Sequence, residues 1–424
     1  MRDYIQTMKK KTVCCAFAAW LLVGYSHGQT TQRSITVDEL FQLVEHGSKA
    51  LKVQTSEVGV AQRGLEEAKS HRLPDINVSL SASYNGNVLM TDRDFSNAKG
   101  ISQPHFGNSF SLQAEQVVYA GGAINAGIRM AELQKEQSES GVEQTRCNQR
   151  YDSNIALTHK LIADIKAKQV QGMALKNDVT RYELQLEQLK LGKRKLQDQK
   201  AILNHQLCNT LMLQGVEVVP EIELDKAEGR NISESQWQSD AISSSPMLRQ
   251  SEIGMQMATQ QLKLAKSELL PKVAIVAADN FDGPFVYDLP PIDKNFNIWY
   301  VGIGVKYSLS SLFKSNKTIR KAKQQQILTR SAHALANETL NNQVQQAYTL
   351  HQQAYIELET QQKSVQLAVQ NYDVVNNRYL NQLALITDMV DASNIRLNAE
   401  LQEVNARINV AYTYYNIMYA AGKL

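Results

Sequence analysis

Between residues 68 and 84 the sequence changes abruptly from a helical pattern to a strict alternation of apolar and polar residues. The helical pattern stops at Leu73 and Pro74, because proline cannot continue a helix. From Ile76 to Tyr84, every second residue is apolar and the residues between are polar. This period of two predicts a strand with one apolar face.

The same change of period occurs again 197 positions later, at Leu270 and Pro271. Each unit also opens with a capping-box pattern, Thr36 with Glu39 in the first and Ser233 with Gln236 in the second, again 197 positions apart. We therefore expect an internal duplication, with repeats at 29–232 and 233–424. Each repeat is predicted to begin with a helix of about 35 residues that ends at a helix-to-strand junction marked by Pro74 or Pro271.

A polar loop and a returning strand are expected next in each repeat, with loops at 87–105 and 282–297 and strands at 106–119 and 298–309. In the last strand Trp299, Val301, Ile303 and Val305 alternate with small and polar residues. A soluble β-sandwich would give the same alternation. Strand lengths beyond about 9–11 residues and aromatic residues toward the strand ends favour membrane strands, whose apolar face would contact lipid.

A helical stretch without proline follows each hairpin, and the longer one covers 314–379. Its 66 residues would form a helix of about 99 Å, which no compact domain requires. The helices expected at 234–269 and 388–422 have 36 and 35 residues. Placed end to end, these two would nearly match the long helix, so we expect it to lie beside both. A heptad seam that begins at Val344 predicts coiled packing.

The first 28 residues resemble a secretory signal, with a basic start, an apolar run at 13–23 and a small-residue cleavage site at Ser26-His27-Gly28. Its removal would take four basic and one acidic residues from totals of 45 and 42, leaving 41 of each. A near-neutral chain gives no indication of nucleic-acid binding. No later apolar run approaches the roughly 20 residues of a membrane helix, so the mature protein is expected to be soluble or to cross a membrane as a barrel.

Chemistry-bearing motifs are absent from the sequence. It contains no HExxH, GxSxG or P-loop pattern and no Cys/His cluster, so neither an enzyme nor a cofactor or metal site is predicted. Two cysteines, Cys147 and Cys208, remain after the signal, too few for a disulfide framework. If the helical hairpin turns near Ala174, the two cysteines are offset by about 10 Å along the helix axis, which is beyond disulfide reach. A turn centred at 177–178 would bring them level.

The order of helix, Leu-Pro, hairpin, long helix, turn and returning helix, twice over, resembles the TolC family of outer-membrane efflux channels across the mature chain. The most specific stretch is RYLNQLALITDMVDA at 378–392, which is similar to that family's RYxxGxxTxxDxLDA turn. Gln382 replaces the usual Gly, and Leu385 the usual Thr or Ser. Further resemblance lies at Gly172 and Asp178 of the first arm, and at Gly121 and Gly122, where strand passes into helix.

This resemblance implies a mainly α fold with a small β part. Three protomers would each give four strands to a twelve-stranded transmembrane β-barrel and their helices to a long α-helical coiled-coil barrel, the periplasmic tunnel. It further implies residence in the outer membrane of a Gram-negative-type bacterium, contact with outer-membrane lipid, and partnership with a periplasmic adaptor and an inner-membrane pump. The implied function is a passive exit duct of a tripartite efflux or type I secretion system.

Motif matching assigns a periplasmic gate to Asp388, Asp391, Tyr379 and Asp178, and the tip turn with its adaptor contact to Gly172, Arg378 and Gln382. The alternative interpretation of the two aspartates is a favourable charge near a helix N-terminus, worth about 0.3–1 kcal/mol each.

Two alternatives for the whole chain stay open. From Gly122 to Gly172 the first arm counts 51 residues against 66 in the second. Either its turn lies elsewhere, or the protein is a shortened, export-deficient member of the family. A periplasmic coiled-coil adaptor would also be exported and helical, but it would have a single helical hairpin between small β-domains.

Overall fold

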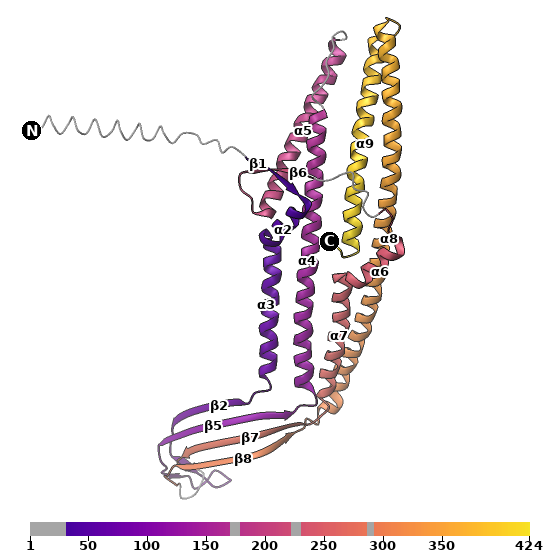
Figure 1. Ribbon diagram of the computed structural model, residues 1–424. Coiled ribbons are helices and arrows are strands. Elements are labelled where there is room, and N and C mark those ends of the chain that lie inside the picture. Colours follow the sequence, from indigo (N-terminus) through magenta and orange to yellow (C-terminus); the bar gives the residue numbers. More distant parts are fainter. Residues whose placement is uncertain (1–30, 170–178, 222–229, 286–291) are drawn as a thin grey trace, which may run out of the picture. The chain divides into compact units, whose positions relative to one another are not determined.

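The computed structural model describes residues 31–169, 179–221, 230–285 and 292–424 (Figure 1). The expected signal at 1–28, together with Gly172 and Asp178, lies outside the described residues. The chain forms two compact units, and each unit combines segments from both predicted repeats. One comprises Met1–Lys52, Thr145–Ser244 and Asn341–Leu424, and the other comprises Val53–Gln144 and Ser245–Leu340. Helices dominate both, so the prediction of a mainly α fold with a small β part is confirmed.

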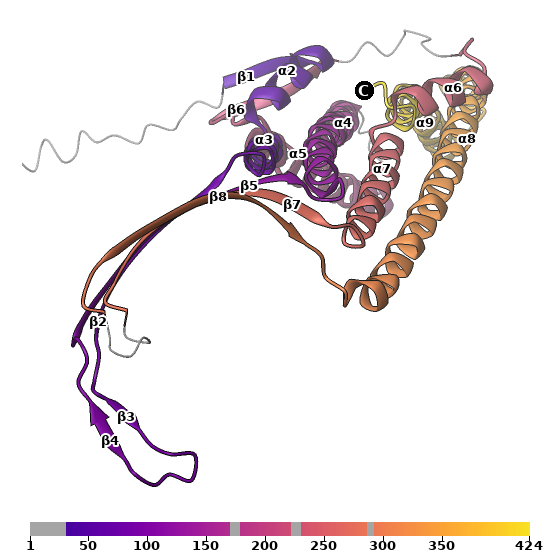
Figure 2. The same cartoon turned by 90° about the horizontal axis from the view of Figure 1, so that it is seen from below.

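An antiparallel sheet of four strands lies in the second of these units, in the order β2-β5-β7-β8 (Figure 1). Figure 2 shows the same strands from below. The strands are β2 (Asp75–Tyr84), β5 (Phe106–Tyr119), β7 (Lys272–Gly283) and β8 (Phe296–Lys306). The prediction that the last strand reaches residue 309 is wrong, because the backbone turns after Lys306, and Ser311 N–H donates to the Ser308 carbonyl at 3.0 Å. The loop expected at 87–105 contains a small hairpin, β3 (Val88–Met90) with β4 (Lys99–Ile101).

The strand register separates two faces of the sheet. Val78 lies opposite Leu112, and Ala277 opposite Val301, so the alternations of all four strands coincide. The resulting apolar face is exposed in the single chain, with Leu80 80% and Ile303 76% exposed. The opposite face carries serine and asparagine, joined across strands by Ser109 to Asp282 at 2.5 Å and Ser111 to Asn280 at 2.7 Å.

The helix predicted at the start of each repeat is in fact two helices. In the first repeat α2 (Val37–Gly47) gives way to α3 (Lys49–Ser70), and in the second α6 (Glu234–Ser244) gives way to α7 (Pro246–Ser267). The breaks fall at Ser48 and Ser245, again 197 positions apart. Each serine hydroxyl accepts the backbone N–H three residues ahead, at 3.3 and 3.4 Å, and so caps the following helix.

The sequence pattern missed these breaks because apolar periodicity continues through them. A serine at a helix start and a proline in the first helical turn, as at Ser245-Pro246, were the available signals.

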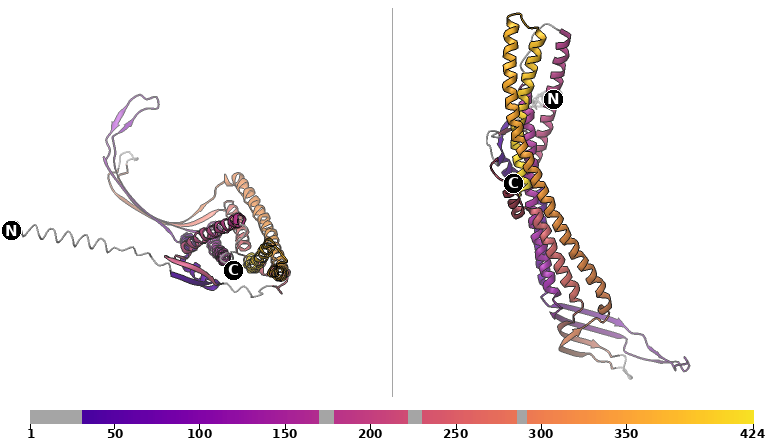
Figure 3. Two further views of the ribbon diagram at one scale, coloured as in Figure 1. Left: turned by 90° about the horizontal axis from the view of Figure 1, so that it is seen from above. Right: turned by 90° about the vertical axis from the view of Figure 1, so that its right-hand side faces the viewer.

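The long helix α8 (Ser311–Leu380) has 70 residues and pairs with different helices along its length. In one unit its first part contacts α7, where Ser251 lies 2.8 Å from His333, and Gln326 donates to Thr259 at 3.0 Å. In the other unit its second part lies beside α9 (Ile386–Ala420), as Figure 3 shows. The expectation that one long helix packs beside two shorter ones is confirmed.

The heptad seam of α8 is buried against α9. Val344 and Ala354 are almost completely buried, and His351 lies among them with Nδ1 3.0 Å from Thr413 Oγ1. A small cluster of Ala354, Tyr355 and Val410 closes the contact. His351 is therefore a polar residue of the helix seam.

A small parallel sheet, which sequence analysis missed, lies in the same unit. β1 (Thr31–Thr36) pairs with β6 (Val216–Glu221). The side chain of Asn204, from α5 (Val179–Leu211), donates to the Val216 carbonyl at 3.0 Å and accepts from the Val218 N–H at 2.8 Å. This amide takes the place of a third strand. No local pattern reveals a pairing between segments some 180 residues apart.

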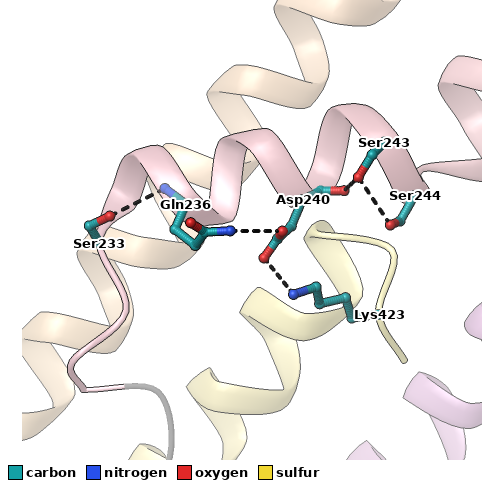
Figure 4. Close-up of polar contacts among 6 residues, drawn as sticks. All are labelled: Ser233, Gln236, Asp240, Ser243, Ser244 and Lys423. Carbon is teal, nitrogen blue, oxygen red and sulfur yellow. Dashed lines mark hydrogen bonds and ion pairs between the residues drawn. The ribbon is translucent and has the colours of Figure 1, made fainter.

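The two short helices that open the repeats are held by different partners. Glu45 of α2 pairs with Arg146 at 2.7 Å and Arg150 at 2.9 Å, both on α4 (Ala123–Gln169). Asp240 of α6 pairs with Lys423, which follows α9 (Figure 4). The bond from Lys423 lowers the pKa of the Asp240 carboxyl below its ordinary value. None of the helices within the described ranges has an apolar stretch long enough to cross a membrane.

Candidate functional site

The turn between α8 and α9 is built from two helix ends. At the end of α8 the Leu383 N–H donates to the Arg378 carbonyl at 2.8 Å, and the Gln382 N–H donates to the Tyr379 carbonyl at 2.9 Å. This pair of bonds is the Schellman arrangement, which places one residue in the left-handed region. That residue is Gln382, with φ of 60°. Glycine is ordinarily preferred there because it has no Cβ.

The start of α9 is capped from one side only. Asp388, in its first turn, accepts the Leu385 N–H at 3.1 Å. A threonine or serine at position 385 would accept a bond in return and complete the capping box. Leu385 has no acceptor in its side chain and is 71% exposed.

These observations give a physical reason for the two departures from the RYxxGxxTxxDxLDA pattern. The pattern's Gly falls on the left-handed residue of the turn, and its Thr falls on the helix N-cap. In this chain Gln382 and Leu385 occupy these two positions and lack the features that fit them best. The turn therefore forms at some cost in local stability.

Three of the side chains assigned to the gate, together with Arg378 of the predicted tip turn, lie at or next to this turn. Asp388 and Asp391 are exposed, Tyr379 is half-buried, and Arg378 is exposed near the end of α8. The ion pairs found among the described residues include none of these four. The contact of Asp388 with the Leu385 N–H fits the alternative interpretation of a helix N-terminal residue. The contacts among the described residues include no corresponding one for Asp391.

Sequence analysis overlooked an apolar feature of the same turn. Leu380, Leu383 and Leu385 are each about 70% exposed. A leucine that continues the apolar pattern of a helix is ordinarily predicted to be buried. The sequence therefore contains no signal that these three would be exposed. The end of this hairpin therefore presents apolar side chains next to the two exposed carboxylates of Asp388 and Asp391.

The helix-to-strand junctions repeat the same geometry in both halves. α3 ends at Ser70 and α7 at Ser267, four residues before Pro74 and Pro271 respectively. After each helix the chain makes one more turn, closed by Leu73 N–H to Ser70 and Leu270 N–H to Ser267. Each proline then leads directly into a strand.

Gly121 and Gly122 connect β5 to α4, both with positive φ, of 61° and 85°. A Cβ on Gly121 would lie 2.8 Å from the Ser267 carbonyl oxygen and 2.8 Å from Leu270 Cβ. The second-half junction therefore packs directly on the first-half junction. A Cβ on Gly122 would meet open space.

Trp299, Val301, Ile303 and Val305 share the apolar face of the sheet with Ile76, Val78 and Leu80 of β2. All are well exposed in the single chain. Asp279 is the acidic exception on this face, in register with Leu112 and Trp299. The apolar side chains form one continuous surface across strands from both halves.

The two cysteines have separate partners. Cys147 is buried, with Sγ 3.3 Å from the Leu424 carbonyl oxygen, and Cys208 Sγ lies 3.3 Å from the Val216 carbonyl oxygen. Burial raises the pKa of the Cys208 thiol, and the charge of Lys160 offsets part of that rise. The first-arm turn that the thiols were expected to locate lies outside the described residues.

Comparison with known proteins gives matches of two kinds. The family model described as outer membrane efflux protein matches residues 237–423, a span that includes all of α8, the turn and α9. No curated protein sequence matches the chain.

Three of the solved structures that resemble the chain show the likeness, each at low sequence identity. The outer-membrane channel OprN has a TM-score of 0.75 at 14% identity, with 92% of this chain and 90% of that chain covered. The CmeC outer membrane channel of Campylobacter jejuni has a TM-score of 0.75 at 14% identity, with 91% and 85% covered. The outer membrane protein VceC of Vibrio cholerae has a TM-score of 0.75 at 14% identity, with 91% and 96% covered.

The family match covers the second half, and the fold likeness extends over nearly the whole chain. Both agree with the resemblance noted at residues 378–392. Residues 237–423 therefore match the outer membrane efflux protein family, and over nearly its whole length the chain has the fold of outer-membrane channels.

Proposed function

We propose that this protein is an outer-membrane channel that acts as the passive exit duct of a tripartite efflux or type I secretion system. The observation that carries the proposal is the four-stranded sheet, whose register gathers the exposed apolar residues of both halves on one face. An exposed apolar face of this extent suits contact with lipid. The proposed location is the outer membrane of a Gram-negative-type bacterium.

The proposal requires an oligomer. The described sheet has β2 and β8 as its edge strands, and four strands cannot close on themselves, since about eight are the practical minimum. Pairing β8 of one copy with β2 of the next would remove both edges. A homotrimer with twelve strands, as the family resemblance implies, satisfies this requirement, and its helices would form the periplasmic tunnel.

The α8–α9 turn is proposed as the tunnel's periplasmic end, with Gly172 and Asp178 in the corresponding turn of the first arm. Three copies would bring together six carboxylates from Asp388 and Asp391, a ring that favours cations. Tyr379 would belong to the closing contacts. Arg378, Gln382 and the exposed leucines would meet a periplasmic adaptor, which couples the duct to an inner-membrane pump.

The channel proposal is tested by fractionation and conductance. We expect the protein in the outer-membrane fraction, as an oligomer that migrates faster when unheated than its size predicts and dissociates on boiling. The purified oligomer should give discrete conductance steps in a planar bilayer. A soluble periplasmic monomer without conductance would contradict the proposal and favour an adaptor.

The carboxylate ring needs a test that spares the helix cap. In the double variant Asp388→Asn and Asp391→Asn, the asparagine at 388 still offers an oxygen to the Leu385 N–H while both charges are lost. We expect intact oligomers with weaker cation selectivity and weaker block by multivalent cations. Asp373→Asn, which removes an exposed charge from α8, should leave both properties unchanged. Wild-type selectivity in the double variant would place the ring elsewhere.

A further inference from the structure

The first turns of α8 carry a dense basic segment just beyond the sheet. Within 311–331 there are six basic residues and no acidic one, all six of them exposed. They are Lys314, Lys317, Arg320, Lys321, Lys323 and Arg330. Among the ion pairs of the described residues, none involves these side chains. Glu268, at the neighbouring end of α7, accepts a hydrogen bond from the Ser315 hydroxyl at 3.4 Å.

The corresponding part of the first half has the opposite balance. Over the first 21 residues of α4, from 123 to 143, there are two basic and four acidic residues. Arg129 there pairs with Glu132 at 3.0 Å, and Lys135 pairs with Glu139 at 3.4 Å. The uncompensated positive charge therefore belongs to α8 and is not a general feature of helices that follow the strands.

An exposed aromatic residue shares one helix face with part of this basic segment. Phe313 is 67% exposed, and Lys317 and Arg320 follow it at spacings of four and seven, which places all three on one side of α8. Along the helix axis Lys317 and Arg320 lie about 6 and 10 Å beyond Phe313. These steps are comparable with a lipid headgroup layer, which is on the order of 5–8 Å thick.

We propose that Phe313, Lys317 and Arg320, with the neighbouring Lys314 and Lys321, bind the headgroups of anionic phospholipids at the edge of the membrane. The inference rests on the proposed function, because it uses the lipid contact assigned to the apolar face of the sheet. β8 ends at Lys306, so α8 starts only a few residues from that apolar surface. The aromatic ring contacts acyl chains, and the cationic groups reach the phosphates.

A second pair of lysines provides a matched comparison. Lys272 and Lys306 lie directly opposite each other at the ends of β7 and β8. They alternate with Val273 and Val305, so they point to the face opposite the apolar one. These two lysines carry the same charge as Lys317 and Arg320 and lie at the end of the sheet that precedes α8, but they face away from the apolar surface.

The test compares lipid binding by the full-length protein in a neutral detergent. Phosphatidylglycerol and phosphatidylcholine are titrated separately, and bound lipid is counted by native mass spectrometry. We expect the wild type to prefer phosphatidylglycerol. The double variant Lys317→Gln and Arg320→Gln should bind it about thirty-fold more weakly, corresponding to about 1 kcal/mol for each charge. The double variant Lys272→Gln and Lys306→Gln should keep wild-type affinity.

Several outcomes would overturn the inference. Equal affinity for the two lipids would exclude recognition of the headgroup charge. Competition by inorganic phosphate at the concentration effective for phosphatidylglycerol would show a site for free anions. If the double variant Lys317→Gln and Arg320→Gln changes ion selectivity but keeps wild-type lipid affinity, these charges lie in the conduit and the inference is wrong. If the wild type conducts but shows no lipid preference, this inference alone fails, whereas absence of conductance would contradict the channel itself.

Discussion

Ser48 in the first half of the chain and Ser245 in the second interrupt a helix and cap the next one in the same way. Thr36 and Ser233 likewise both accept the N–H three residues ahead, at 3.2 and 3.3 Å. Ser70 and Ser267 close the two junction helices with matching bonds of 2.7 Å to the carbonyl three residues back. The halves therefore agree at the points where helices start, break and end.

Between those points the halves diverge. The described part of α4 has 47 residues and α8 has 70, while α5 and α9 have 33 and 35. The buried equivalents Leu40 and Trp237 differ greatly in size, and so do Val44 and Ala241. In the second half the large Trp237 is followed one helical turn later by the small Ala241, whereas the first half has Leu40 and Val44, two residues of intermediate size, at the same positions. Helix ends demand particular chemical groups, whereas buried positions demand only that volume be filled.

The largest expected effect concerns the apolar face to which both halves contribute. Val78→Arg in the first half and Ile303→Arg in the second should each destabilise the inserted protein by about 2–4 kcal/mol, because a charge would face lipid. Ser79→Arg and Gly302→Arg are the matched controls on the opposite face, and a Cβ at Gly302 meets open space. Yield of heat-modifiable oligomer measures the effect. Tolerance of Ile303→Arg together with failure of Gly302→Arg would reverse the assigned faces.

A smaller effect tests the contact between the two junctions. Both Gly121→Ala and Gly122→Ala carry the cost of a positive φ, about 1–2 kcal/mol. Only the first also drives a Cβ into Ser267 and Leu270 of the other half, which should add about 1–3 kcal/mol. Chemical denaturation of the two variants, followed by tryptophan fluorescence, measures the difference. Equal destabilisation would show that the junctions do not pack together.

The turns after α8 and α9 allow two substitutions that should change helix-end stability in opposite directions. Gln382→Gly should stabilise the turn by about 1 kcal/mol, because glycine adopts the left-handed conformation without strain. Gly422, with φ of 67°, occupies the equivalent place after α9, where Lys423 N–H donates to Met418 and Gly422 N–H to Tyr419. Gly422→Gln should therefore destabilise its helix end by a similar amount. Local hydrogen exchange of the two helix ends measures both changes, and a loss of protection in Gln382→Gly would refute the assignment.

The smallest effect concerns the anchor of α6. Because Lys423 lowers the pKa of Asp240, the contact contributes stability above the ordinary carboxyl pKa of 3.8 and loses it as the pH falls through the lowered value. Hydrogen exchange of α6 should accelerate over this acidic range in the wild type. Lys423→Gln should remove that dependence, and Lys363→Gln on α8 should preserve it. An unchanged profile in Lys423→Gln would mean that another group governs the acid response.

The sequence by itself determined the repeat, the four strands and the pairing of one long helix with two short ones. These features depend on local periodicity and on prolines and caps at fixed positions, which act through neighbouring residues. The resemblance at residues 378–392 also located the turn between α8 and α9. Its backbone follows from helix-end chemistry that the sequence expresses directly, even where Gln382 and Leu385 replace the preferred residues.

Only the tertiary structure decided which distant residues meet. The pairing of β1 with β6, the coverage of β6 by Asn204 and the contact of Gly121 with Leu270 each join segments far apart in the chain. The exposure of Leu383, and the lack of ion pairs between Lys317 and other residues that the structure describes, depend on which neighbours the fold supplies. Periodicity contains no such information. A residue's type limits the contacts it can make, and the fold selects among them.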